Sequence, residues 1–217
     1  MRCPMSLGTF QRAVVELTLA PRKARALRDG DESALADYSL TGRERDRILD
    51  IVRQPGMSVN CSLARGNRFE VIAETFPMTC VLLEPVLREL LDELWEDYLP
   101  ANYQLTGEET AFAAIVRRKT AAGELSIEYL DEIFAYEVAC REMIQRMRIQ
   151  PGPDAVIEAA VEFQHSPDEL LPPLSRLAAP PPGLPRGSYP ARVKLRGERF
   201  EVQTLPGSET SALHSTG

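Results

Sequence analysis

Apolar residues recur at helical spacing through the first two thirds of the chain. From Leu7 to about Arg148, apolar positions return every three or four residues with polar positions between them, a pattern typical of amphipathic helices. The sequence therefore predicts a succession of helices. We expect them near residues 10–17, 21–29, 31–38, 41–52, 58–75, 85–99, 106–118 and 126–147.

Capping residues support several of these helix starts. Thr41 with Glu44, and Thr106 with Glu109, have the spacing of a capping box, in which each side chain bonds the backbone of the other. Gln54-Pro55-Gly56 is expected to break the chain, and Gly66 to be a possible interruption in the helix that follows. Ser126 is expected to cap the longest helix.

The segment RGNRFEVIAETFPMTC predicts a helix with a sharp end. Phe69, Ile72, Ala73 and Phe76 have the spacing of a buried helical face, and Pro77 prevents another regular turn. We expect a core helix followed by a tight turn.

The hydrophobic pattern changes after residue 150. Residues 155–163 favour a strand, residues 166–177 a helical turn or two, and the proline-rich residues 178–187 a stiff loop. Residues 189–195 and 198–205 alternate with period two around Arg196-Gly197, which predicts a hairpin. The fold class is thus α+β, a mainly helical bundle with a small C-terminal antiparallel sheet. The expected domains are 1–150 (helical), 151–205 (β-containing) and 206–217 (a disordered tail).

Charge and composition limit the classes of partner. The 217 residues carry a formal net charge of −7, and no apolar run approaches the length of a membrane span. We expect a cytoplasmic protein with no membrane partner. Nucleic acid is not an expected partner, because phosphate binding requires a basic face.

Residues that could carry chemistry are few. Four separated cysteines and the two histidines, His165 and His214, provide no metal-binding spacing, and no nucleotide-binding or serine-hydrolase motif occurs. We therefore expect no catalytic residues, metal or cofactor. Glu137 lies among apolar residues, where a structural ion pair with Arg68 or Arg65 is the expected reason for a buried carboxylate.

The hairpin offers one candidate binding surface. An edge strand exposes unpaired backbone groups that can accept an extended peptide as an added strand. The alternative is that the hairpin only closes a small sheet with residues 155–163. The candidate peptide-binding residues are Arg192, Val193, Lys194, Leu195, Phe200, Glu201 and Val202.

The run R-x-N-R-F-x-x-I-x-x-x-F-P at residues 65–77, followed by Trp95 and by Tyr136-Glu137, resembles a known family. It is similar to the MbnC-like helical partner proteins of multinuclear non-heme iron-dependent oxidases, which modify ribosomally made peptides. A related group labelled as DNA-binding domains shares the N-x(8)-F-P and Y-E features. The resemblance covers about the second to fourth fifths of the chain.

The resemblance implies a subunit without catalytic activity of its own. Such a chain binds the leader of a precursor peptide, in a natural-product pathway, and forms a heterodimer with the oxidase that holds the iron. A DNA-binding transcriptional regulator is the alternative, with basic clusters at Arg43, Arg45 and Arg47 and at residues 117–119. An enzyme in its own right is the third hypothesis, which the missing motifs favour least.

Overall fold

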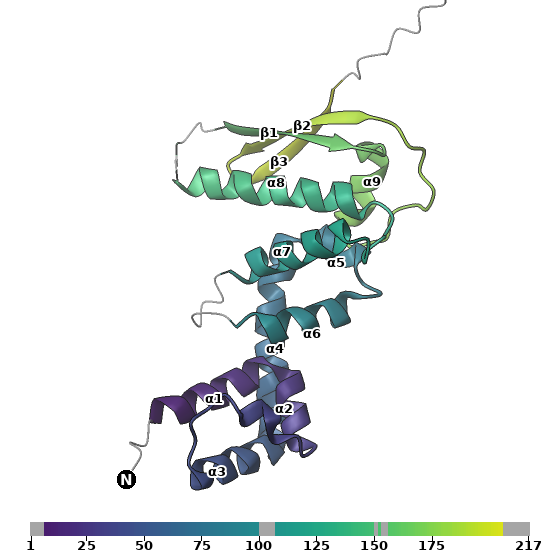
Figure 1. Cartoon of the computed structure of the whole chain (residues 1–217). Helices are drawn as coiled ribbons and strands as arrows, with labels where there is room; N and C mark the ends of the chain where they lie inside the picture. The colour runs from purple at the N-terminus through teal and green to yellow at the C-terminus, as the bar shows by residue number, and fades with distance from the viewer. Residues whose placement is uncertain (1–6, 100–106, 150–151, 153–155, 206–217) are drawn as a thin grey trace, which may run out of the picture. The chain divides into compact units, whose positions relative to one another are not determined.

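The computed structural model describes residues 7–99, 107–149, 152 and 156–205, and these form two compact units (Figure 1). The first lies within Met1–Glu74 and Val86–Lys119, and the second within Thr75–Pro85 and Thr120–Gly217. The boundary between the two units differs from the domain boundary predicted at residue 150, because the long helix over residues 130–149 belongs to the same unit as the sheet. Thr106 and the predicted tail, 206–217, lie outside the described residues.

The first unit is helical. Its elements are α1 (Leu7–Leu19), α2 (Pro21–Arg28), the short 3₁₀ helix η1 (Glu32–Leu35), α3 (Gly42–Arg53), α4 (Pro55–Thr75), α6 (Leu87–Asp97) and α7 (Glu108–Ala121). The capping box of Thr41 and Glu44 is confirmed. The expected break is confirmed at Gln54, an extended residue where α3 ends. The next helix begins earlier than predicted, because Pro55 is the first residue of α4, a position that needs no backbone N–H. Gly66 does not interrupt that helix.

A buried ion pair occupies the interior of the first unit. The Arg68 guanidinium is fully buried and donates to the Glu108 carboxylate, with Nε 2.5 Å from Oε1. It also donates to the carbonyl oxygens of Leu19 at 2.9 Å and Tyr98 at 2.7 Å, and lies over the Trp95 ring. The expectation that Glu137 pairs with Arg68 or Arg65 is therefore wrong: Arg68 pairs with Glu108. Among the described residues, Glu137 forms no ion pair with either arginine.

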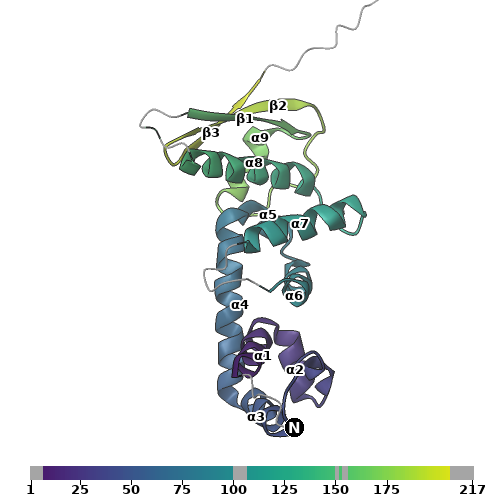
Figure 2. The ribbon, with the colours of Figure 1, turned by 60° about the vertical axis from the view of Figure 1, so that its left-hand side comes forward.

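The second unit packs helices against a small sheet (Figures 1 and 2). Its elements are α5 (Pro77–Leu82), α8 (Leu130–Ile149), β1 (Val156–Phe163), α9 (Pro167–Leu174), β2 (Tyr189–Arg196) and β3 (Arg199–Thr204). The three strands are antiparallel in the order β1-β2-β3. The predicted α+β class, with its strand and hairpin, is confirmed.

Alternation along the strands explains how the sheet covers α8. The side chains of Val161 and Phe163 on β1, and of Ala191, Val193 and Leu195 on β2, are buried in one apolar cluster. The residues between them point to the other face and are largely exposed, as expected for a sheet with one side against a helix. Both α8 and α5 contribute apolar side chains to this cluster.

Glu137 on α8 holds the start of α5. Its carboxylate accepts hydrogen bonds from the backbone N–H groups of Met78 at 2.7 Å and Thr79 at 2.9 Å. Pro77 is the first residue of α5 and has no N–H, and Phe76 provides no side-chain cap. A carboxylate from another helix therefore satisfies the donors that the helix start leaves free. The Phe76 ring packs against Phe134, 5.7 Å between centroids.

This arrangement explains the predicted sharp turn at Phe76-Pro77 in physical terms. Burial raises the pKa of Glu137 to about 6, against the opposing effect of the Thr79 and Met78 donors.

Among the described residues, no helix has both the length and the apolar character required to cross a membrane.

The raised pKa of Glu137 predicts a specific pH dependence of stability. The folded state binds the Glu137 proton more tightly than the unfolded state does, so protonation of Glu137 stabilises the fold. This stabilisation is fully present below the ordinary pKa of 4.5 and is lost as the pH rises through about 6. Between pH 4.5 and pH 7 the free energy of unfolding should fall by about 2 kcal/mol more in the wild type than in Glu137→Gln. Urea denaturation followed by circular dichroism measures this difference.

Glu142→Gln is the matched control, because Glu142 lies exposed on the same helix. The control should follow the wild-type pH dependence. A stability difference between wild type and Glu137→Gln that is the same at both pH values would contradict this account.

Candidate peptide-binding edges and a polar pocket

Four of the predicted peptide-binding residues do not lie on a sheet edge. Arg192, Val193, Lys194 and Leu195 are on β2, the central strand, which pairs with β1 on one side and β3 on the other. The prediction of an edge position is wrong for them, because their backbone groups already belong to the two ladders. The Arg192 and Lys194 side chains lie on the outer face, 3.7 Å and 3.2 Å from the Glu158 carboxylate.

The other three predicted residues lie on an edge strand. Phe200, Glu201 and Val202 are on β3, and among the described residues no strand pairs with the outer side of β3. The hairpin therefore does close a small sheet with β1, as the alternative reading expected, and it also leaves one of its own strands at an edge. Sequence reasoning placed these three residues correctly.

Register identifies the backbone groups that face outward from β3. Leu205 N–H donates to the carbonyl of Pro190 at 2.7 Å. Leu205 and Pro190 are therefore a hydrogen-bonded pair. Bonded and non-bonded pairs alternate along an antiparallel ladder, so counting back along β3 makes Gln203 with Arg192, and Glu201 with Lys194, bonded pairs as well. Phe200 and Val202 then direct their N–H and C=O groups to the open side. Positive φ at Gly197 alone in the two-residue loop fits a type II′ turn, which fixes this register.

The opposite edge of the sheet is β1, and in the part of the chain that the structure describes no strand pairs with its outer side. The backbone groups of each β2 residue bond either to β3 or to β1. Glu158, Ala160 and Glu162 lie opposite β2 residues that bond to β3, so their own N–H and C=O groups face outward from β1. The strand itself was predicted. Its position at an edge was not, because strand order depends on pairing between distant segments.

A polar pocket lies at the end of the sheet where β1 leaves it. Its volume is about 590 Å³. The predicted helix start at Ser126 is wrong: α8 begins at Leu130, and the preceding residues 125–129 form part of the pocket wall. The remaining lining comes from the end of α7, the start of α8, the residues after β1 and the proline-rich loop. It includes Thr120, Gly123, Asp131, Glu132, Gln164, His165, Leu184 and Arg186.

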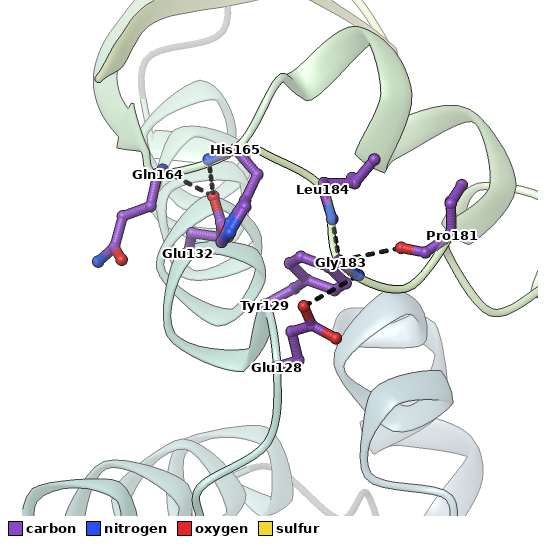
Figure 3. Close-up of polar contacts among 8 residues, drawn as sticks. All are labelled: Glu128, Tyr129, Glu132, Gln164, His165, Pro181, Gly183 and Leu184. Carbon is purple, nitrogen blue, oxygen red and sulfur yellow. Dashed lines mark hydrogen bonds and ion pairs between the residues drawn. The ribbon is translucent and has the colours of Figure 1, made fainter. Parts of the chain in front are cut away.

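Glu132 and His165 form a buried pair in this pocket (Figure 3). The Glu132 Oε1 atom is 2.5 Å from Nδ1 of His165, and Oε2 accepts from the backbone N–H groups of Gln164 at 2.8 Å and His165 at 3.1 Å. The Tyr129 ring meets the imidazole edge-on, 4.7 Å between centroids. A carboxylate on Nδ1 fixes the orientation of the ring and leaves Nε2 as the available nitrogen.

The proline-rich loop is attached to the residues before α8. Tyr129 Oη donates to the carbonyl of Pro181 at 2.9 Å and accepts from Leu184 N–H at 3.0 Å, and Glu128 accepts from Gly183 N–H at 3.2 Å (Figure 3). Tyr129 has a φ of 67°, which is uncommon for a residue other than glycine. These bonds hold one wall of the pocket in place.

Sequence reasoning did not identify this pocket. Glu132 and His165 are 33 positions apart, and neither belongs to a motif that signals chemistry. Among the described residues, no group of three or more histidine, cysteine, aspartate or glutamate side chains could hold a metal ion. The arrangement offers an oriented imidazole and several carboxylates, which suit binding of a hydrogen-bond donor.

The basic clusters considered for DNA binding contain several ion pairs. Arg45 lies 3.3 Å from Glu32, and Arg118 and Lys119 both lie 2.8 Å from Glu93. These pairs neutralise part of each cluster, which reduces its attraction for phosphate.

Comparison of the chain with protein-family models, with curated proteins and with solved structures finds no match.

The central position of β2 predicts how proline substitutions differ. Val193 is fully buried and its N–H bonds to β1, whereas Val202 N–H faces the open side of β3. Val193→Pro should lower the free energy of unfolding by about 3 kcal/mol or more, and Val202→Pro by much less. Urea denaturation of the two variants tests this order. Equal losses would mean that β2 is not the central strand.

Proposed function

We propose that the chain is a non-catalytic partner subunit that binds a precursor peptide and forms a complex with an iron-dependent oxidase that modifies the peptide. The open β3 edge is the observation that supports peptide binding most directly. The outward N–H and C=O groups of Phe200 and Val202 have the spacing of an unoccupied ladder. The complex is proposed to act in the cytoplasm.

The side chains of β3 suggest what an added strand should contain. Phe200 and Val202 are partly buried against the apolar cluster, whereas Glu201 points to the opposite, exposed face. Peptide side chains that lie beside Phe200 and Val202 would share their apolar surroundings, and those beside Glu201 would face solvent. We therefore propose a leader segment with apolar residues at alternate positions, and a polar or basic residue beside Glu201.

The oxidase part of the proposal rests on the family resemblance. Residues 65–77 and Tyr136-Glu137 carry that resemblance, and the structure gives them a scaffold role: Arg68 lies in the interior of the first unit, and Glu137 caps α5. A chain with a packed scaffold and an open edge strand is suited to positioning a peptide for another protein. In this proposal the oxidase supplies the iron and the chemistry.

Affinity purification from the native host tests both parts of the proposal. Tagged wild type, Val202→Pro and Ala160→Pro are compared, with mass spectrometry of the co-purifying proteins and peptides and an iron assay on the eluate. Val202→Pro removes an N–H from the open side of β3, and Ala160→Pro removes one from the open side of β1. The two substitutions are therefore matched controls for the two edges.

The proposal predicts that all three proteins recover an iron-containing oxidase, and that only Val202→Pro loses the precursor peptide. Loss of the peptide from Ala160→Pro alone would move the binding site to β1. Wild type recovered as a metal-free protein without an oxidase would contradict the partner role.

A further inference from the structure

Within the described part of the chain, a buried histidine with a hydrogen bond at only one ring nitrogen lies in the wall of the polar pocket. His165 is 5% exposed, and its Nδ1 is bound to the Glu132 carboxylate. Among the described residues, no hydrogen bond reaches Nε2 of this ring. A neutral imidazole with its proton on Nδ1 presents a lone pair at Nε2, and His165 is part of the cavity wall.

Carboxylates predominate among the charged groups in the rest of the lining. The carboxylates of Glu128 and Asp131 are exposed at the pocket, and Glu128 has one oxygen bonded to Gly183 N–H. The Glu132 charge is already matched by two backbone N–H groups and the imidazole. One guanidinium, that of Arg186, is among the lining residues. The groups that remain for a ligand are therefore mainly negative.

This chemistry selects a ligand that is rich in donors and positively charged. An alkylammonium has three donors and no acceptor, and a guanidinium has five. The cavity of about 590 Å³ is much larger than either group alone, so it has room for the side chain together with neighbouring peptide.

We propose that this pocket is a binding site for an alkylammonium or guanidinium group, carried by a lysine or arginine of a peptide or by a free diamine. In this arrangement the charged group lies between the Glu128 and Asp131 carboxylates and donates to Nε2 of His165. No residue of β3 is in the lining. The site is thus separate from the β3 edge, and it stands or fails independently of strand addition.

NMR of the histidine side chains gives a direct test on the full chain. The chain has only two histidines, His165 and His214, so the imidazole proton and nitrogen spectrum is simple to assign with a His214→Gln variant. Three probes are titrated: the blocked tripeptide alanine-lysine-alanine, the same peptide with norleucine in place of lysine, and cadaverine. Norleucine keeps the alkyl chain and removes the ammonium.

Variants that replace exposed carboxylates by neutral amides provide matched controls that leave the buried pair intact. Glu128→Gln with Asp131→Asn removes two pocket carboxylates. Asp168→Asn with Glu169→Gln removes two exposed carboxylates from α9, which are outside the lining. Both double variants change the net charge equally, so a general charge effect would appear in both.

The proposal predicts a saturable shift of the His165 signals with the lysine peptide and none with the norleucine peptide. The dissociation constant should rise about tenfold or more in the Glu128/Asp131 variant, and stay unchanged in the Asp168/Glu169 variant. Cadaverine binding tighter than the lysine peptide would identify a free amine as the ligand, and the reverse order a peptide side chain. Equal binding of lysine and norleucine peptides, or no shift with any probe, would overturn the proposal.

Discussion

The two hydrogen bonds from the Met78 and Thr79 backbone to the Glu137 carboxylate are the constraint on which the second unit depends. They attach residues 75–85 to α8, although the bonded residues are 59 and 58 positions apart in the chain. A buried carboxylate is costly to desolvate, and burial raises its pKa to about 6, so the site is favourable only while both N–H groups are present. The proline at the start of α5 and the glutamate on α8 are thus two halves of one interaction.

The same helix uses a second carboxylate in the same way. Glu132, one turn and a half earlier on α8, accepts from the backbone N–H groups of Gln164 and His165, where β1 ends. One helix therefore fixes α5 with one glutamate and the end of the sheet with another. The β3 edge and the polar pocket belong to the same packed unit, in which the apolar cluster supports them. Rigid support lowers the entropy cost of binding a flexible peptide.

Local patterns allowed much of this fold to be predicted. Period-two alternation and Gly197 identified the β2–β3 hairpin, and Thr41 with Glu44 identified a helix start, because each signal is contained within a few neighbouring residues. Pairing between distant segments was not predictable in this way. The amphipathic pattern of α8 showed that one face is buried, but not that the sheet covers it. For the same reason the sequence does not show that Arg192 to Leu195 lie on the central strand, or that two backbone amides, and not an arginine, are the partners of Glu137.

Hydrogen exchange of the β3 amides, with and without the leader of the precursor peptide, tests the central claim most directly. The amides of Glu201 and Gln203 bond to β2, whereas those of Phe200, Val202 and Thr204 face the open side. Strand addition predicts that the leader slows exchange at the outward-facing amides and leaves Glu201 and Gln203 nearly unchanged. Equal protection along β3, or protection confined to the outward amides of β1, would contradict peptide binding at this edge.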